Sequence, residues 1–146
     1  VNIMSYDMGK PPQHNSALHP SSMTKRSCEE AIKFHYQAGV PYNKMTLGMP
    51  FYGHGDQKAF KEGIYFNKIK TEGYTEKWDD KAKVPYLVDA NGTMVLTYDN
   101  ERSIGLKADY IKSRGLLGAM YWNIEGDDNN WTLSKAIATR LLQPAE

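Results

Sequence analysis

Short apolar runs and helical patterns alternate at the start of the chain. Residues 1–6 alternate apolar and polar positions and are rich in strand-forming residues, which predicts a strand. Ser27 and Glu30 have the spacing of a capping box, so we expect a helix from there to about Ala38. A second strand is expected at about residues 45–51. The chain therefore opens as strand, helix, strand.

The middle of the chain is charged, is interrupted by glycines and predicts antiparallel structure. A short helical turn is expected near residues 65–70 and a strand near residues 74–78. Residues 85–89 and 93–98 are two further strand-like runs, and they flank Asn91-Gly92. Asn-Gly between two such runs is a strong signal for a β-hairpin.

The last third returns to helices alternating with a strand. Asn100 can cap a helix that runs to about Arg114, and residues 117–122 form a short apolar strand. Thr132 can cap a final helix. Both helices carry an apolar stripe at helical spacing: Ile104, Ala108 and Ile111 on the first, and Leu133, Ile137 and Leu141 on the second.

Strands that alternate with helices predict an α/β fold with a parallel sheet, here interrupted by an antiparallel insertion. Three parallel strands cannot close a barrel, and a barrel of eight units takes about 250 residues. Any barrel would therefore be present only as its last part. The chain also starts within a predicted strand, without an initiator Met or a leader, which is typical of a piece of a longer protein.

Charge and composition exclude several classes of function. Lys and Arg number 18 and Asp and Glu 17, a formal charge of +1, so no nucleic-acid or acidic-membrane partner is expected. No apolar run approaches the roughly 20 residues that cross a bilayer. The single cysteine, Cys28, excludes an internal disulfide, and the four histidines do not form a ligand set. We expect no metal and no cofactor.

Rings that carry a polar atom lie at the end of each predicted parallel strand. Tyr6 precedes Asp7, Tyr52 follows the second strand, and Trp122 ends the third. Met4 shares the face of Tyr6 because side chains in a strand alternate. Functional groups gather at the carboxyl ends of parallel strands. Two interpretations stay open: the rings merely fill the mouth of a barrel, or they bind a ligand. Likewise Asp7 is either a turn residue or a hydrogen-bond acceptor for a substrate.

The acidic loop before the last helix is a weaker candidate. Glu125, Asp127 and Asp128 lack the spacing and the central glycine of a calcium loop. Glu125 follows a strand end, as a general acid can, but no second carboxylate pattern supports that role. A solvated loop that caps the last helix is the favoured interpretation.

Three segments together resemble strands six, seven and eight of the family-18 glycoside hydrolases, the chitinases. They are Met-Ser-Tyr-Asp at residues 4–7, Leu-Gly-Met-Pro-Phe-Tyr-Gly at 47–53 and Gly-Ala-Met-Tyr-Trp at 118–122. Between the last two, four short motifs resemble a small chitinase insertion domain: Trp78-Asp79, Val84-Pro85-Tyr86, Tyr98-Asp99 and Ser103-Ile104.

The resemblance implies the C-terminal portion, strands six to eight, of a TIM (β/α)8 barrel with a small α+β insertion domain. Residues 1–55 would hold barrel strands six and seven with the intervening helix. Residues 56–98 would form the insertion domain, and residues 99–146 would hold strand eight with its flanking helices.

The resemblance also implies substrate-assisted, retaining hydrolysis of chitin or other N-acetylglucosamine-containing glycans, an exception to the two-carboxylate scheme. A Glu on strand four protonates the glycosidic oxygen, and the substrate's N-acetyl carbonyl attacks the anomeric carbon. The signature of that Glu, Asp-x-x-Asp-x-Asp-x-Glu, is absent from this sequence and is expected upstream of Val1. This segment would therefore supply a sugar-binding wall and be inactive alone.

The family's roles can be carried over to five residues. Tyr6 would donate to the acetamido group and Asp7 would accept from the sugar, both as catalytic residues. Trp122 would form the floor under the sugar ring, while Met4 and Tyr52 would line the pocket.

The chain departs from the family pattern in two places. His54 stands where many relatives carry Arg, and residues 8–12, Met-Gly-Lys-Pro-Pro, replace a Gly-Ser-Trp-like loop. Contacts with more distant sugars therefore do not follow from the resemblance.

Three functions compete at this point. The first is a hydrolase, and the second is a non-hydrolytic, lectin-like relative that keeps the aromatic floor but lacks the acid. Glu on strand four would favour the first, and Gln or Leu the second. The third is an ordinary α/β domain whose aromatic residues form the core.

A partial barrel that acts on chitin also has expected partners and an expected location. Unpaired strand edges predict that the isolated chain oligomerises, swaps, aggregates or pairs with the missing N-terminal part. Because polymeric chitin cannot enter a cell, we expect a secreted, periplasmic or cell-surface protein.

Overall fold

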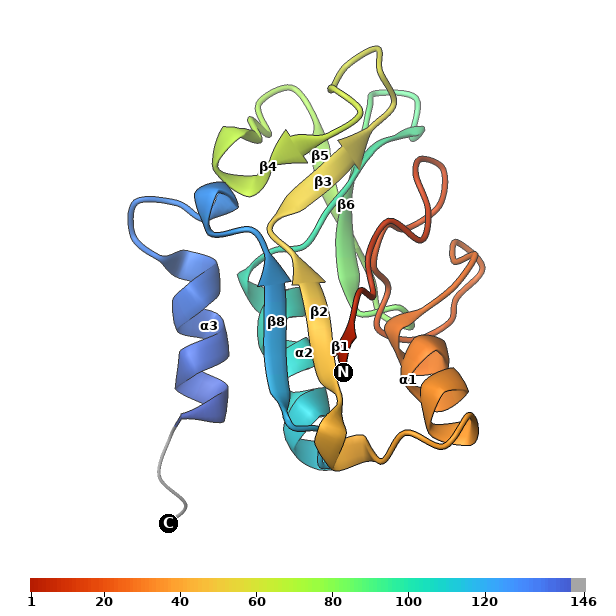
Figure 1. Ribbon diagram of the computed structural model, residues 1–146. Helices are drawn as coiled ribbons and strands as arrows, with labels where there is room; N and C mark the ends of the chain where they lie inside the picture. Colours follow the sequence, from red (N-terminus) through yellow and green to blue (C-terminus); the bar gives the residue numbers. More distant parts are fainter. Residues whose placement is uncertain (143–146) are drawn as a thin grey trace.

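A parallel sheet lies at the centre of the molecule, which the computed structural model describes over residues 1–142. Its strands are β1 (Asn2–Ile3), β2 (Thr46–Pro50) and β8 (Gly118–Trp122), in the order β1-β2-β8 (Figure 1). All neighbours are parallel, as the alternation of strands and helices predicts. β1 is shorter than the six residues expected.

The first two helices begin and end where their caps predict. α1 (Cys28–Gln37) starts with a capping box, since the Ser27 side chain accepts from the backbone of Glu30, whose own side chain accepts from Ser27. α2 (Glu101–Arg114) starts at Asn100, which accepts from the N–H of Ser103. It ends at Gly115, whose φ of 72° suits a residue without a side chain.

The third helix, α3 (Thr132–Leu141), is capped differently from the sequence prediction. Thr132 is its first helical residue, and Trp131 stands at the cap position with no side-chain hydrogen bond. Asp128 instead accepts from the N–H of Thr132 at 2.9 Å, and Asp127 accepts from the N–H of Leu133 at 3.0 Å. The prediction for Thr132 is therefore wrong, whereas the capping role of the acidic loop is confirmed.

A second, antiparallel sheet of five strands lies over the carboxyl ends of β2 and β8 (Figure 1). In spatial order its strands are β4 (Ile64–Tyr65), β3 (Tyr52–Gly55), β7 (Met94–Thr97), β6 (Val84–Val88) and β5 (Thr75–Asp79). The predicted β6–β7 hairpin and β5 are confirmed, but β3 and β4 were not predicted. Three short 3-10 turns complete the described elements: Tyr42–Lys44, Phe66–Lys68 and Ile124–Gly126.

Phe51 joins the two sheets. It is the one residue between β2 and β3, it is fully buried, and its ring stacks on Tyr121 with centroids 4.5 Å apart. The chain thus leaves the parallel sheet and enters the second sheet without a turn, which explains why sequence patterns did not reveal β3.

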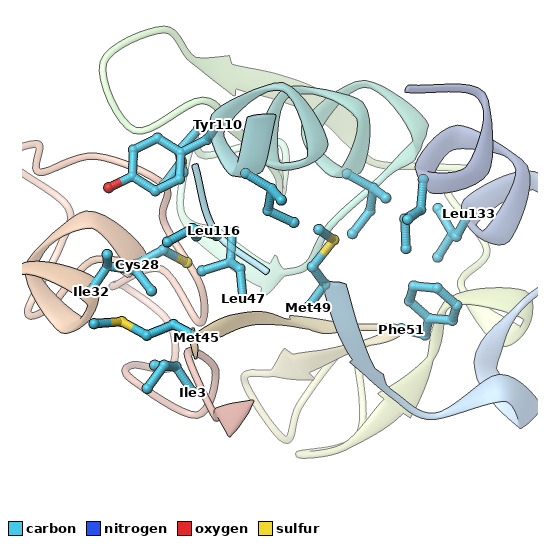
Figure 2. Packing of buried hydrophobic residues seen from close by; sticks show 14 residues of the cluster. Ile3, Cys28, Ile32, Met45, Leu47, Met49, Phe51, Tyr110, Leu116 and Leu133 are labelled. Carbon is cyan, nitrogen blue, oxygen red and sulfur yellow. The ribbon is translucent and has the colours of Figure 1, made fainter. Parts of the chain in front are cut away.

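The main core lies between the parallel sheet and the three helices. Leu47 and Met49 of β2 lie in the row of side chains that runs from Ile32 of α1 to Leu133 of α3 (Figure 2). The predicted stripes are confirmed: Ile104, Ala108, Ile111, Leu133 and Ile137 are buried, and Leu141 packs against the cluster.

Two buried polar pairs, which sequence patterns did not predict, attach the long loop after β1 to the rest of the fold. Lys107 of α2 contacts Asp99 at 2.8 Å and donates to Ser16 Oγ at 2.8 Å. His14 contacts Asp79 of β5 at 2.9 Å, and burial lowers the pKa of His14 in spite of that carboxylate. Both lysine and histidine are fully buried, so their partners are required.

No helix within residues 1–142 is both long and apolar enough to cross a membrane.

Removal of the Lys107 ammonium should strongly destabilise the fold. In Lys107→Met, Asp99 stays buried without its counter-charge, and breaking one partner of a buried pair costs about 3–5 kcal/mol. Urea denaturation measures the loss. Lys112→Met on the exposed face of α2 is the matched control, and adding Asp99→Asn to Lys107→Met should recover part of the loss. Equal losses of stability in Lys107→Met and Lys112→Met would contradict the importance of the buried Lys107–Asp99 pair.

The Asp128 cap should make α3 sensitive to acid. Hydrogen bonds from the Thr132 side chain and backbone lower the pKa of Asp128. A lowered folded pKa stabilises the protein above the unfolded value, near 4, and that contribution is lost as pH falls through the folded pKa.

Asp128→Asn should therefore cost about 0.5–1 kcal/mol at pH 7. Thermal melts from pH 7 to pH 3 should show the difference from wild type shrinking with acid. Glu72→Gln, at an exposed position, is the control, and a difference that stays constant with pH would refute the capping role.

Candidate functional site

The five site residues expected from the sequence line one pocket of about 580 Å³. Residues from the ends of β1 and β8 and from β3 and β4 surround it: Met4, Tyr6, Asp7, Tyr52, His54, Gly63, Ile64, Tyr65 and Trp122. The pocket lies at the carboxyl edge of the parallel sheet, where the strand ends converge.

The strand geometry determines which side chains reach the pocket. Tyr52 and His54 are two residues apart on β3, so they point to the same side of the second sheet. The ring of Tyr52 meets the ring of Tyr6 edge-on, with centroids 6.1 Å apart. The two sheets thus each contribute an aromatic wall.

Asp7 is the polar centre of the pocket. Its Oδ1 accepts from the Tyr52 hydroxyl at 2.6 Å and contacts His54 Nε2 at 2.7 Å. The other ring nitrogen of His54, Nδ1, lies 2.8 Å from the carbonyl oxygen of Glu62. His54 therefore bridges the Asp7 carboxylate and the backbone at Glu62.

The two tyrosines are held as hydrogen-bond donors. Burial and the neighbouring Asp7 raise the pKa of Tyr52 far above its usual value, and the same two causes raise the pKa of Tyr6. The Tyr6 hydroxyl contacts only a weak acceptor within the described chain, Met120 Sδ at 3.6 Å. Its proton is therefore available to a stronger acceptor in the pocket.

Trp122 and Met4 give the pocket an exposed apolar surface. Their exposed fractions are 58% and 72%. Phe51, which precedes Tyr52, lies in the core instead. An exposed indole beside polar groups offers a flat apolar face to a ligand.

Four residues of the pocket lining were not assigned a role from the sequence, and two of them, His54 and Tyr65, carry polar side-chain groups. His54 was noted only as a departure from a family pattern, although its alternation with Tyr52 could have placed it. Tyr65 lies on the unpredicted β4, and its hydroxyl accepts from Asn123 Nδ2 at 3.2 Å, next to Trp122. No local pattern points to it, because the second sheet brings it there.

No group of three or more His, Cys, Asp or Glu side chains within residues 1–142 is arranged to hold a metal ion.

Comparison with known proteins identifies the family. The sequence model of glycosyl hydrolases family 18 matches residues 1–127. The chain belongs to family 18. This membership also excludes the third interpretation, an unrelated α/β domain.

Two curated relatives and one solved structure that this family-18 chain resembles are named chitinases. It is 34% identical to Chitinase A1 of Niallia circulans, covering 92% of this chain and 25% of that protein. It is 42% identical to Chitinase B of Serratia marcescens, covering 81% of this chain and 32% of that protein. The crystal structure of Chitinase ChiW from Paenibacillus sp. superposes with a TM-score of 0.83 at 30% identity, covering 99% of this chain and 20% of that one.

The chain thus spans about a quarter to a third of the length of these two curated relatives.

Proposed function

We propose that this chain carries the sugar-binding wall of a glycosidase that acts on chitin or other N-acetylglucosamine-containing glycans. The observation that carries the proposal is the grouping of Trp122, Tyr6 and the Asp7 cluster in one pocket. An exposed flat indole, a hydroxyl donor and a carboxylate acceptor are what a sugar with an acetamido group requires. The names of the relatives support the same substrate class.

Within this proposal, β1, β2 and β8 are strands six, seven and eight of a TIM barrel. Their parallel order and the crossing α2 support that placement. The proposed segments are residues 1–55, 56–98 for the insertion domain, and 99–146, whose last four residues lie outside the described ones. The first segment includes β3, whose backbone pairs with β7 in the second sheet.

Each side chain has a defined role in binding. The apolar face of a sugar ring packs on Trp122, and Met4 and Tyr52 border that face. The Tyr6 hydroxyl donates to the acetamido group and orients it. Tyr52 and His54 occupy Asp7 Oδ1, so Asp7 Oδ2 remains for a sugar hydroxyl or amide, and the Asp7 side chain is 59% exposed.

The proposed chemistry is substrate-assisted and retaining. The acetamido carbonyl oxygen attacks the anomeric carbon, while an acid protonates the departing glycosidic oxygen. Tyr6 and Asp7 contribute by holding the acetamido group in line, since orientation of reacting groups lowers the barrier. Among the described residues that line the pocket, Asp7 is the one carboxylate, and two donors already engage it.

We therefore propose that these 146 residues alone bind sugar without hydrolysing it. Hydrolysis would require a Glu in the Asp-x-x-Asp-x-Asp-x-Glu signature, which the printed sequence does not contain. The alternative is a non-hydrolytic, lectin-like protein. Both functions use the same binding wall, so the identity of the strand-four residue separates them.

The proposal extends to partners and location. A polymeric substrate favours a secreted, periplasmic or cell-surface protein. The outer edges of β1 and β8 have no neighbour within residues 1–142, which favours oligomerisation or pairing with further barrel strands.

Binding of chitotetraose to the natural polypeptide that carries this chain tests the function. The sugar should quench tryptophan fluorescence, and Trp122→Ala should weaken binding roughly thirtyfold, as loss of a central aromatic anchor does. Trp131→Ala is the matched control, because Trp131 is similarly exposed, at 51%, and does not line the pocket.

A wild type that binds no chitotetraose would refute the proposed function, and equal losses in the two variants would refute the role of Trp122. Release of shorter sugars in the same samples would favour the hydrolase over the binding protein.

A further inference from the structure

The backbone of Asp7 has an unusual conformation. Its φ is 58°, in the left-handed region that side-chain-bearing residues rarely adopt, although Asp tolerates it better than most. This conformation directs the carboxylate toward Tyr52 and His54. Because Asp7 is exposed, packing around its own side chain does not hold it there. Besides the contacts with Tyr52 and His54, the orientation of Asp7 therefore depends on a restraint on its backbone.

Asn15 supplies that restraint. Its Oδ1 accepts from the N–H of Asp7 at 2.7 Å, and its carbonyl oxygen accepts from the N–H of Met8 at 3.0 Å. Two consecutive backbone donors are thus bound by one residue eight positions away. Asn15 itself is fully buried and does not line the pocket.

The second sheet fixes the position of Asn15. Its N–H donates to Thr97 Oγ1 of β7 at 2.8 Å, and Thr97 is 1% exposed. Thr97 lies opposite His54 in the β3–β7 ladder. The strand that presents His54 to Asp7 is therefore paired with the strand that holds Asn15.

We infer that Asn15 is a positioning residue for Asp7 and that Thr97 acts on Asp7 through Asn15. The inference rests on the proposed function, since it concerns how the sugar-binding carboxylate is oriented. Leu in place of Asn15 would have the same shape but no acceptor for the Asp7 N–H. Asp would accept, but it would bury a second negative charge beside Asp7.

The first arm of the test measures backbone order and needs no sugar. In the natural polypeptide that carries this chain, Asn15→Leu should speed amide hydrogen exchange of Asp7 and Met8 at least tenfold relative to wild type. Ser16→Ala is the control, because Ser16 is also buried in this loop but has no hydrogen bond to Asp7. Unchanged exchange of the Asp7 amide in Asn15→Leu would overturn the inference.

The second arm measures function. Asn15→Leu should lower kcat/KM for chitotetraose, or its binding constant if the protein only binds, by about 10- to 100-fold, as misplacement by about 1 Å does. Ser16→Ala should lower the melting temperature with a change of less than threefold in that constant. Equal functional losses in both variants would mean a merely structural role and would also overturn the inference.

Two substitutions of Thr97 test the inference if Asn15→Leu does not fold. Thr97→Val removes the acceptor for Asn15 and should reproduce the faster Asp7 exchange, whereas Thr97→Ser keeps the hydroxyl and should restore the wild-type rate. Identical exchange of the Asp7 amide in the two variants would contradict the inference that Thr97 acts on Asp7 through Asn15. A wild type without sugar binding would refute the proposed function, and the exchange arm would still decide the role of Asn15.

Discussion

The arrangement of the two sheets depends on one buried ammonium group. Lys107 reaches from α2, which covers the parallel sheet, to Asp99 and to Ser16. Asp99 lies two residues after β7 of the second sheet, and Ser16 lies in the loop after β1. Taking two charges out of water costs several kcal/mol per ion, and only close, complete contacts offset that cost. All three elements must therefore meet at one point. The charged pair specifies a geometry that apolar packing around Phe51 alone would leave less defined.

This geometry extends to the pocket through the loop. Ser16 contacts Lys107, its neighbour Asn15 contacts Thr97, and Asn15 in turn binds the backbone of Asp7. The loop looks irregular in sequence, yet its polar groups are bound to the rest of the fold on both sides of Asn15. Hydrogen bonds thus connect the proposed sugar site to the junction of the sheets, and such support helps to orient an acetamido group.

Features that depend on neighbouring residues could be predicted from the sequence, whereas features that depend on distant contacts could not. Ser27 and Asn100 marked the starts of two helices because a cap is a contact within three residues. The prediction for Thr132 was wrong because Asp127 and Asp128 cap α3. These carboxylates lie four to seven residues before the N–H groups that they bind. The five pocket residues could be grouped from the sequence because parallel strand ends converge. The role of His54 and the burial of Lys107 could not, since both depend on how the second sheet packs over the first.

The most direct test of the account is a crystal structure of the natural polypeptide that carries this chain with an N-acetylglucosamine oligosaccharide. We expect a sugar ring against the indole of Trp122, with its acetamido group within hydrogen-bond distance of the Tyr6 hydroxyl and of Asp7. The Asp7 carboxylate should still contact Tyr52 and His54. An oligosaccharide bound elsewhere, with the indole of Trp122 uncovered, would contradict the account.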